Sequence, residues 1–231
     1  MQLCYGWIYG FALQDIKLTT DNDMFDHPCV NPNVTGWLRY NPNKPLPEPQ
    51  LVMAYPDFED TDLVPLEPMP VVPYDELVTI TVNFTDFDSV NYAIVNNNSY
   101  SAPNVPAMLT ALTTGSDATD PEVYGNTTNS FVLNHLDMVW VVINNDDDGG
   151  HPCTTLQSHD KLIAVHIHGH SFQVLYRSDE DVGHFDPSQP PPMRDNPVRR
   201  DVILVKGGGY AILAFRADNP GVWYPHPITL C

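Results

Sequence analysis

The chain has 231 residues, which is enough for one or two domains with a sizeable apolar core. Its 29 Asp and Glu residues outnumber its 10 Lys and Arg residues, giving a formal net charge of -19. This charge argues against nucleic acid or an anionic membrane surface as a partner. It fits both a role in attracting cations and the ordinary acidity of an extracellular protein of low pI, and the sequence leaves both interpretations open.

The first part of the chain is predicted to form short strands. Ala12–Thr20 partly alternates between apolar and polar residues, and Gly36–Tyr40 alternates as well. The stretch that follows, up to residue 75, is dense in proline with acidic residues between, which indicates an extended linker. Neither a signal peptide nor an apolar run long enough to span a membrane is found, so we expect the chain to begin inside a larger protein.

Strong alternation over Leu77–Phe84 predicts the first strand of the main domain. Pro106–Leu112 is expected to contain a short helical turn. Further strands are predicted at fairly regular spacing, with turn residues between them, at Val90–Asn96, Ser130–Leu133, Met138–Asn144, Ile167–Arg177, Asp201–Lys206 and Ala211–Arg216. Many short strands separated by turns are typical of a β-sandwich.

Four histidines carry most of the chemical signal: His151, which precedes Pro152, and then His166, His168 and His170. If this segment is a strand, the last three share one face, because successive side chains point to opposite sides. Neighbouring imidazoles would then lie roughly 6–7 Å apart, two strand rises, which suits ligands of two adjacent metal ions. Neutral imidazole suits copper, zinc, iron and nickel. A single His-x-His is more often structural, but three alternating histidines around a glycine favour a metal site.

The cysteines argue against a zinc site or a redox dithiol, since Cys4, Cys29, Cys153 and Cys231 stand far apart and form no Cys-x-x-Cys pair. A hydrolytic zinc site is disfavoured too, because no His-Glu-x-x-His occurs. Four Asn-x-Ser/Thr sequons would be glycosylated in a secreted protein, and together they favour secretion: Asn33, Asn83, Asn97 and Asn126.

His151-Pro152, followed after an intervening segment by His166-Ile167-His168-Gly169-His170-Ser171-Phe172, resembles the third copper motif of multicopper oxidases, His-Pro-x-His-x-His-Gly-His-x-Phe. Asn196–Asp201 and Ala217–Trp223 resemble the stretch that leads to the fourth motif of that family, and Asn91–Ala93, Val105-Pro106 and Leu112–Gly115 match upstream. The resemblance covers nearly the whole chain and is strongest to fungal laccases and iron-transport ferroxidases. It implies an all-β, cupredoxin-like Greek-key β-sandwich, preceded by the tail of a second cupredoxin domain.

The resemblance also implies the domain limits. Residues 1–45 would be the C-terminal remnant of the second cupredoxin domain, residues 46–75 a proline-rich linker, and residues 76–231 the third cupredoxin domain, truncated at its end. Within the last domain, we expect Arg199-Arg200-Asp201 to form an ion-pair and hydrogen-bond network behind the metal cluster.

Family motifs carried over residue by residue imply copper at type 1, type 2 and type 3 sites. His151 would be a type 1 ligand, His166 a type 2 ligand, and His168 and His226 type 3 ligands. His170 matches a position that is not usually a ligand. No catalytic residues beyond these ligands are implied.

Two departures from the family pattern stand out. The family has a single residue between His-Pro and His-x-His, whereas this chain has the 13 residues Cys153–Val165. Pro227 stands where the type 1 cysteine is expected, and Cys231 is not aligned with it. The His-x-His motifs of the family's first domain are also absent. We therefore expect the chain by itself to be inactive.

The resemblance implies oxidation of ferrous iron, with dioxygen reduced to water. Ferroxidases of the family add oxygen ligands near type 1 copper, and the matching positions are Asp147, Tyr100, Asp21 and Asp26. The residues alone leave open that Asp147 belongs to an acidic turn and that Tyr100 is a packing residue. A laccase-type phenol oxidase and a non-catalytic copper-binding sandwich are the alternatives.

The expected location is extracellular or at the cell surface, through the secretory pathway. An iron permease is the expected partner if the full-length protein is anchored to a membrane. The other expected partners are dioxygen with ferrous iron or a phenolic substrate.

Overall fold

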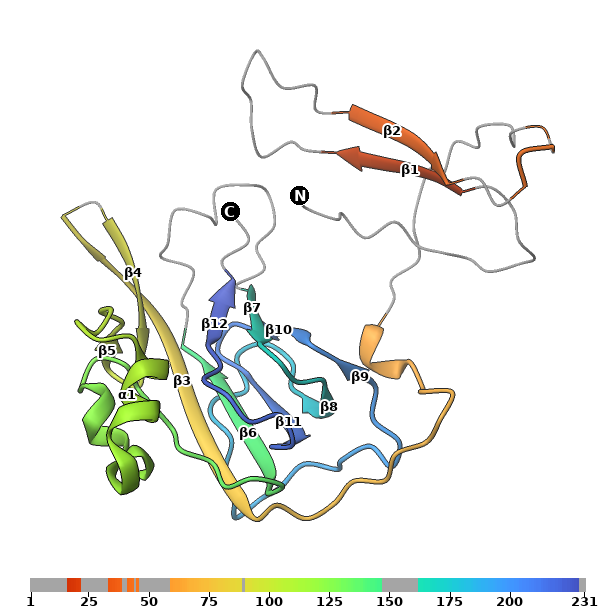
Figure 1. The fold of residues 1–231 in the computed structure, drawn as a ribbon. Coiled ribbons are helices and arrows are strands. Elements are labelled where there is room, and N and C mark those ends of the chain that lie inside the picture. Colours follow the sequence, from red (N-terminus) through yellow and green to blue (C-terminus); the bar gives the residue numbers. More distant parts are fainter. Residues whose placement is uncertain are drawn as a thin grey trace. The chain divides into compact units, whose positions relative to one another are not determined.

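A computed structural model describes residues 16–21, 33–38, 41–43, 45, 59–88, 90–146 and 162–228 (Figure 1). The chain divides into two compact units, Met1–Phe58 and Glu59–Cys231. The first unit contains an antiparallel pair of strands, β1 (Ile16–Asp21) and β2 (Asn33–Leu38). Both overlap the strands that alternation predicted in this region.

The described residues of the second unit form two sheets (Figure 1). The seven-stranded sheet has the spatial order β5 (Asn98–Ser99), β4 (Val90–Val95), β3 (Glu76–Phe87), β6 (Met138–Asn145), β11 (Tyr210–Arg216), β8 (Phe172–Arg177) and β9 (Arg199–Arg200). The three-stranded sheet has the order β10 (Val202–Lys206), β7 (Leu162–Ile167) and β12 (Pro225–Ile228). Neighbouring strands are antiparallel except β3 and β6, which run parallel.

The main core lies between the two sheets. Phe172, Leu213 and Ile163 are completely buried, the first two from the seven-stranded sheet and the third from β7. The same apolar cluster joins residues of β3, β6, β8 and β11 to residues of β7 and β10. Side chains from both inner faces therefore interdigitate, which confirms the predicted sandwich.

A second apolar cluster covers the outer face of the seven-stranded sheet, around Leu175 and Ile212. The segment that precedes β3 packs here, since Val71 belongs to the cluster, the Trp140 Nε1–H donates to the Val72 carbonyl at 3.1 Å, and the Gln173 amide donates to the Met69 carbonyl at 2.8 Å. The predicted linker thus lies partly against the sandwich, from Glu59 onward, because outward-facing apolar side chains need cover.

Helices are few and short in the part of the chain that the structure describes. They are η1 (Asp60–Asp62), α1 (Ala107–Thr113), η2 (Gly115–Thr119) and η3 (Pro121–Tyr124). The first turn of α1 matches the predicted helical turn. Within the described ranges, no helix combines the length and apolar character that a membrane crossing needs.

The strand predicted at Ser130–Leu133 is wrong. Leu133 packs against the core, but Phe131 is largely exposed and the segment joins no sheet. Asn129 before it and Leu136 after it have positive φ values of 48° and 72°, which interrupt an extended backbone.

Candidate metal centre

The histidine segment makes a turn where a single strand was predicted. β7 ends at Ile167 and β8 begins at Phe172, with His168 and Gly169 in a turn between them. The prediction that Ile167–Arg177 is one strand is therefore wrong, and so is the shared strand face for His168 and His170. Gly169 has a φ of +71°, a conformation that glycine adopts without strain.

The His166 and His168 rings nevertheless meet. Their centroids lie 4.9 Å apart with planes inclined by 46°, and both residues are partly buried. This separation is closer than two strand rises, because His168 has left the extended strand. Among the described side chains, no group of three or more histidines, cysteines or acids converges to hold a metal ion, so this histidine pair is the nucleus of the candidate site.

A backbone carbonyl sets the tautomer of His166. Its Nδ1 lies 2.7 Å from the carbonyl oxygen of Asp201, which also accepts the Ile167 N–H at 3.2 Å. A carbonyl only accepts hydrogen bonds, so Nδ1 carries the proton of the neutral ring and Nε2 carries the lone pair. Metal-binding histidines in proteins are commonly held in this way.

His170 supports the turn instead. Its Nδ1 donates to the His168 carbonyl at 3.1 Å, and its ring packs 4.9 Å from Phe215 and 5.8 Å from Trp223, measured between centroids. Its Nε2 is buried and has no hydrogen-bond partner within the described part of the chain. The position thus fixes the path of the backbone between His168 and β8.

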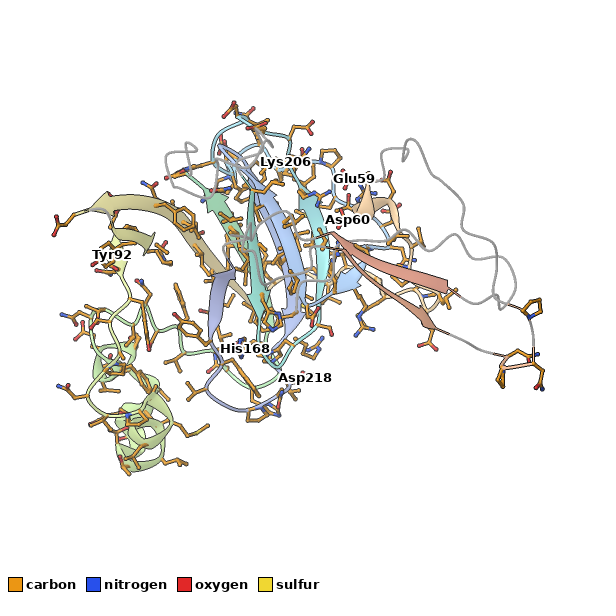
Figure 2. The ribbon with its side chains drawn as sticks, turned by 90° about the horizontal axis from the view of Figure 1, so that it is seen from above. Glu59, Asp60, Tyr92, His168, Lys206 and Asp218 are labelled. Atoms are coloured by element: carbon orange, nitrogen blue, oxygen red, sulfur yellow. The ribbon has the colours of Figure 1, made fainter. Side chains whose placement is uncertain are left out.

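The loop before β12 also holds this turn in place through hydrogen bonds. The Asn219 Nδ2 donates to the Gly169 carbonyl at 2.9 Å, and the Trp223 Nε1–H donates to the Asn219 carbonyl at 2.7 Å. Figure 2 shows His168 and Asp218 at one end of the sandwich and Lys206 at the other. The loop that clamps the turn leads directly into β12.

Strand β12 brings a further histidine position to the site. In the backbone register, His226 lies opposite His166, and Pro227 lies opposite Val165. Proline donates no hydrogen bond to a ladder, and β12 lies at one described edge of its sheet, where proline is tolerated.

The strand position three residues before His166 belongs to the core. The family spacing would place the type 1 histidine there, but the 13-residue segment shifts His151 away and Ile163 occupies the position. Ile163 is completely buried and packs in the main apolar cluster.

Tyr100 lies near the start of β12. Its ring makes an edge-to-face contact with Tyr224, with 5.3 Å between centroids, and both side chains are about half exposed. Burial, and then the nearby Tyr100, raise the pKa of the Tyr224 hydroxyl above its usual value. Tyr100 is therefore placed beside the residue that precedes Pro225, and the packing interpretation of Tyr100 also has a contact to support it.

The remaining candidate site residues are not among the described residues of the second unit. Asp147, His151 and Asp26 lie outside the described residues, and Asp21 ends β1 in the other unit. Of the sequon residues, Asn83, Asn97 and Asn126 are exposed, and Asn33 begins β2.

Of the predicted network at Arg199-Arg200-Asp201, an ion pair of Arg200 and hydrogen bonds to the Asp201 carbonyl are present, and the ion-pair partner is one that sequence reasoning missed. The Arg200 guanidinium pairs with the Asp60 carboxylate, whose other oxygen lies 2.7 Å from Arg177 Nη2. Arg177 also pairs with Glu59. No signal in the sequence links these charges, because they lie more than a hundred positions apart.

Glu59 is ionised more readily than an ordinary glutamate. Partial burial opposes its charge, but hydrogen bonds from Thr61 and the neighbouring Arg177 outweigh burial. The pKa of the Glu59 carboxyl therefore lies below its usual value of 4.5.

The chain is similar in sequence to known proteins. A family model described as multicopper oxidase matches residues 100–229. The iron transport multicopper oxidase fetC of Epichloe festucae is 38% identical over 213 residues, covering 89% of this chain and 32% of the relative. The iron multicopper oxidase fer1 of Mycosarcoma maydis is 40% identical over 216 residues, with the same coverage of 89% and 32%. The chain thus spans about a third of the length of these relatives.

Solved structures agree with this assignment. Fet3p, a multicopper oxidase that functions in iron import, superposes with a TM-score of 0.70 at 32% identity, covering 92% of this chain and 40% of that one. The laccase of Botrytis aclada gives a TM-score of 0.59 at 26% identity, covering 85% and 34%. The expected cupredoxin-like fold is confirmed, and the chain belongs to the multicopper oxidase family, whose members bind copper.

Proposed function

We propose that the chain is the C-terminal part of a copper-dependent oxidoreductase that oxidises ferrous iron and reduces dioxygen to water. In this proposal residues 1–45 end a second cupredoxin domain, residues 46–75 connect it, and residues 76–231 form the third. The share of the relatives that the chain spans is consistent with one such domain and the end of another.

The observation that carries the proposal is the arrangement of His166 beside His168. The Asp201 carbonyl leaves the lone pair of His166 on Nε2, and the adjacent His168 ring offers a second imidazole. Imidazole is a good copper ligand, so these residues fit the metal. We propose His166 as a type 2 ligand and His168 and His226 as type 3 ligands. Copper, when bound, supplies the one-electron steps that reduction of dioxygen requires.

The described residues do not fit a type 1 site. Pro227 stands at the cysteine position of the motif and has no ligating side-chain atom, and buried Ile163 holds the histidine position on β7. His151 is proposed as the type 1 ligand on its motif alone. Because the thiolate that such a site needs is missing, we expect the chain by itself to bind copper without turnover.

Iron is the proposed substrate, with Asp147, Tyr100, Asp21 and Asp26 as its binding residues. Carboxylate and phenolate oxygens are hard ligands, which favour the ferric product. Two lines of support favour iron over a phenol: the iron-transport relatives cover most of the chain, and Fet3p superposes better than the laccase. The laccase match at 26% identity keeps phenol oxidation as the second candidate.

The protein is proposed to act outside the cell or at its surface. Exposure of the sequon residues Asn83, Asn97 and Asn126 supports glycosylation there, and Asn33 is proposed as a fourth site. An iron permease is the proposed partner of a membrane-anchored full-length form.

The test compares substrates. In a form extended to the full length of the relatives, with the motif cysteine restored at Pro227, kcat/KM is measured for Fe2+ and for a phenol. We expect Fe2+ to be preferred, and Tyr100→Phe to lower kcat/KM for Fe2+ by roughly tenfold while the phenol value changes little. Tyr92→Phe is the matched control, since Tyr92 is another exposed tyrosine, on β4. If the extended form with Tyr100 and Tyr92 unchanged prefers the phenol, the laccase assignment replaces the ferroxidase assignment.

A further inference from the structure

We propose that Asp60 is a positioning residue for the His166 imidazole and acts through Arg200 and the backbone of Asp201. The proposal rests on the proposed role of His166 as a copper ligand. The contacts that support it are made by this chain's own residues, so they can be tested before any copper is added.

Asp201 lies where the chain passes from one sheet to the other. Arg199–Arg200 form β9, at one described edge of the seven-stranded sheet, and Val202 begins β10 in the three-stranded sheet. β9 pairs with β8 at only two positions, Phe172 and Gln173. On the β10 side, the Asp201 carbonyl accepts the Ile167 N–H and Val202 pairs with His166. On the β9 side, so short an edge strand holds the crossing weakly by its backbone alone, so the direction of the carbonyl also depends on what else holds Arg200.

The Asp60 carboxylate keeps Arg200 in place. One of its oxygens accepts from Arg200 and the other from Arg177, at the ends of β9 and β8. The side chains of Arg177, Arg200 and Asp60 are only 9%, 22% and 26% exposed. Charge-assisted bonds in such partly buried places are stronger than surface ion pairs, which contribute little.

Asp60 is itself fixed in place. It begins the short helix η1, where the Glu59 side chain accepts the Thr61 N–H at 3.2 Å, and Thr61 is buried. The Thr61 hydroxyl also accepts from Arg194 at 2.9 Å. Figure 2 shows Glu59 and Asp60 together at the side of the sandwich. The helix therefore acts as a rigid anchor for Arg200.

The ion pairs of Asp60 affect His166 through the carbonyl oxygen of Asp201. The Asp201 carbonyl accepts the Nδ1–H of His166, and this bond decides which ring nitrogen carries the proton. If Arg200 is released, the crossing gains freedom and the carbonyl is aligned with Nδ1 for less of the time. The proton then redistributes between Nδ1 and Nε2, and fewer molecules present the Nε2 lone pair.

The experiment measures the tautomer directly. In the chain labelled with 15N in its imidazole rings, two-bond 1H–15N correlation spectra are recorded without metal, at a pH where the rings are neutral. Asp60→Asn is expected to lower the Nδ1–H fraction of His166, while His170 and His184 keep their signals. Copper affinity of the same variant should fall by roughly 3–10-fold, less than the 10–100-fold typical of a direct outer-shell partner.

Asp62→Asn is the matched control. Asp62 lies in the same helix and also pairs with an arginine, Arg194, at 3.0 Å, but Arg194 does not adjoin Asp201. We expect this variant to leave the His166 tautomer unchanged. An unchanged tautomer in folded Asp60→Asn overturns the proposal, as does an equal change in both variants.

Arg200→Lys covers the case in which Asp60→Asn does not fold. It keeps the positive charge but loses the planar fork of the guanidinium, so the Nδ1–H fraction should fall in the same direction. An unchanged fraction again overturns the proposal. If the tautomer changes but copper affinity does not, the positioning is supported and the assignment of His166 as a copper ligand fails.

Discussion

The indole ring of Trp223 lies against the Cα of Gly169, so that a Cβ at Gly169 would come within 2.7 Å of the ring. Gly169→Ala should therefore force the turn and the loop before β12 apart, in addition to the strain of a φ of +71°. We expect a loss of about 2–4 kcal/mol in the free energy of unfolding, measured by urea denaturation.

Gly183→Ala separates the two contributions. Gly183 also has a positive φ, +86°, but nothing lies within 4 Å of the position that a Cβ would take there. This variant should lose only the conformational part, about 1 kcal/mol. Equal losses at both glycines would show that the Trp223 contact contributes nothing.

Copper binding by the chain should depend on the histidine pair. His166→Ala and His168→Ala are each expected to weaken binding of Cu2+ by roughly tenfold or more, measured by calorimetric titration. His184→Ala is the control, because His184 pairs with Asp146 just after β6, at the opposite end of the strands. A similar loss in all three variants would point to nonspecific binding by surface imidazoles.

The sandwich core should be sensitive to cavities. Leu213 is completely buried between the sheets, and Leu213→Ala is expected to cost about 2–5 kcal/mol in thermal or urea unfolding. Leu112→Ala provides the contrast, since Leu112 on α1 is 74% exposed and should change stability by less than about 0.5 kcal/mol. A small effect at Leu213 would contradict the tight packing of the two sheets.

Glu59 should make stability depend on pH. Since its folded pKa lies below the usual 4.5, its charge stabilises the fold above that value, and the contribution is lost as the pH falls through the folded pKa. The stability difference between the unmodified chain and Glu59→Gln should thus be constant near neutral pH and shrink under acid conditions.

Thr61→Val tests the cause of that pH dependence. The Thr61 hydroxyl donates to Glu59 at 2.6 Å, and valine keeps the shape without the donor. In this background the acid-dependent part of the difference should be smaller. A difference that stays constant on acidification in the unmodified background would refute a lowered pKa for Glu59.

The strand positions followed largely from local pattern. Alternation at Leu77–Phe84 and the apolar run at Met138–Asn144 correspond to β3 and β6, because inward and outward faces impose a period of two. The same rule failed at Gly169, where a positive φ breaks the period within a run of apolar and histidine residues. The periodicity of apolar residues alone does not reveal such a turn.

Contacts between residues far apart in the sequence could not be predicted from local sequence patterns. The network residues Arg199–Asp201 were expected to be structural, but nothing near Asp60 in the sequence indicates that it meets Arg200. The packing of Val71 on the sheet and the bond from Gln173 to the Met69 carbonyl were not predicted, because the prolines around them indicate an extended chain equally well for a free linker and for a docked one.

The pairing of β12 with β7 also fixes an order of events in the cell. While the polypeptide is still being made, β7 has at least one open edge until residues 225–228 have left the ribosome. A ligand set that includes the positions of both His166 and His226 exists only after that moment. Under the proposed ligand set, copper can be held from both strands only after β12 has been synthesised and has paired with β7.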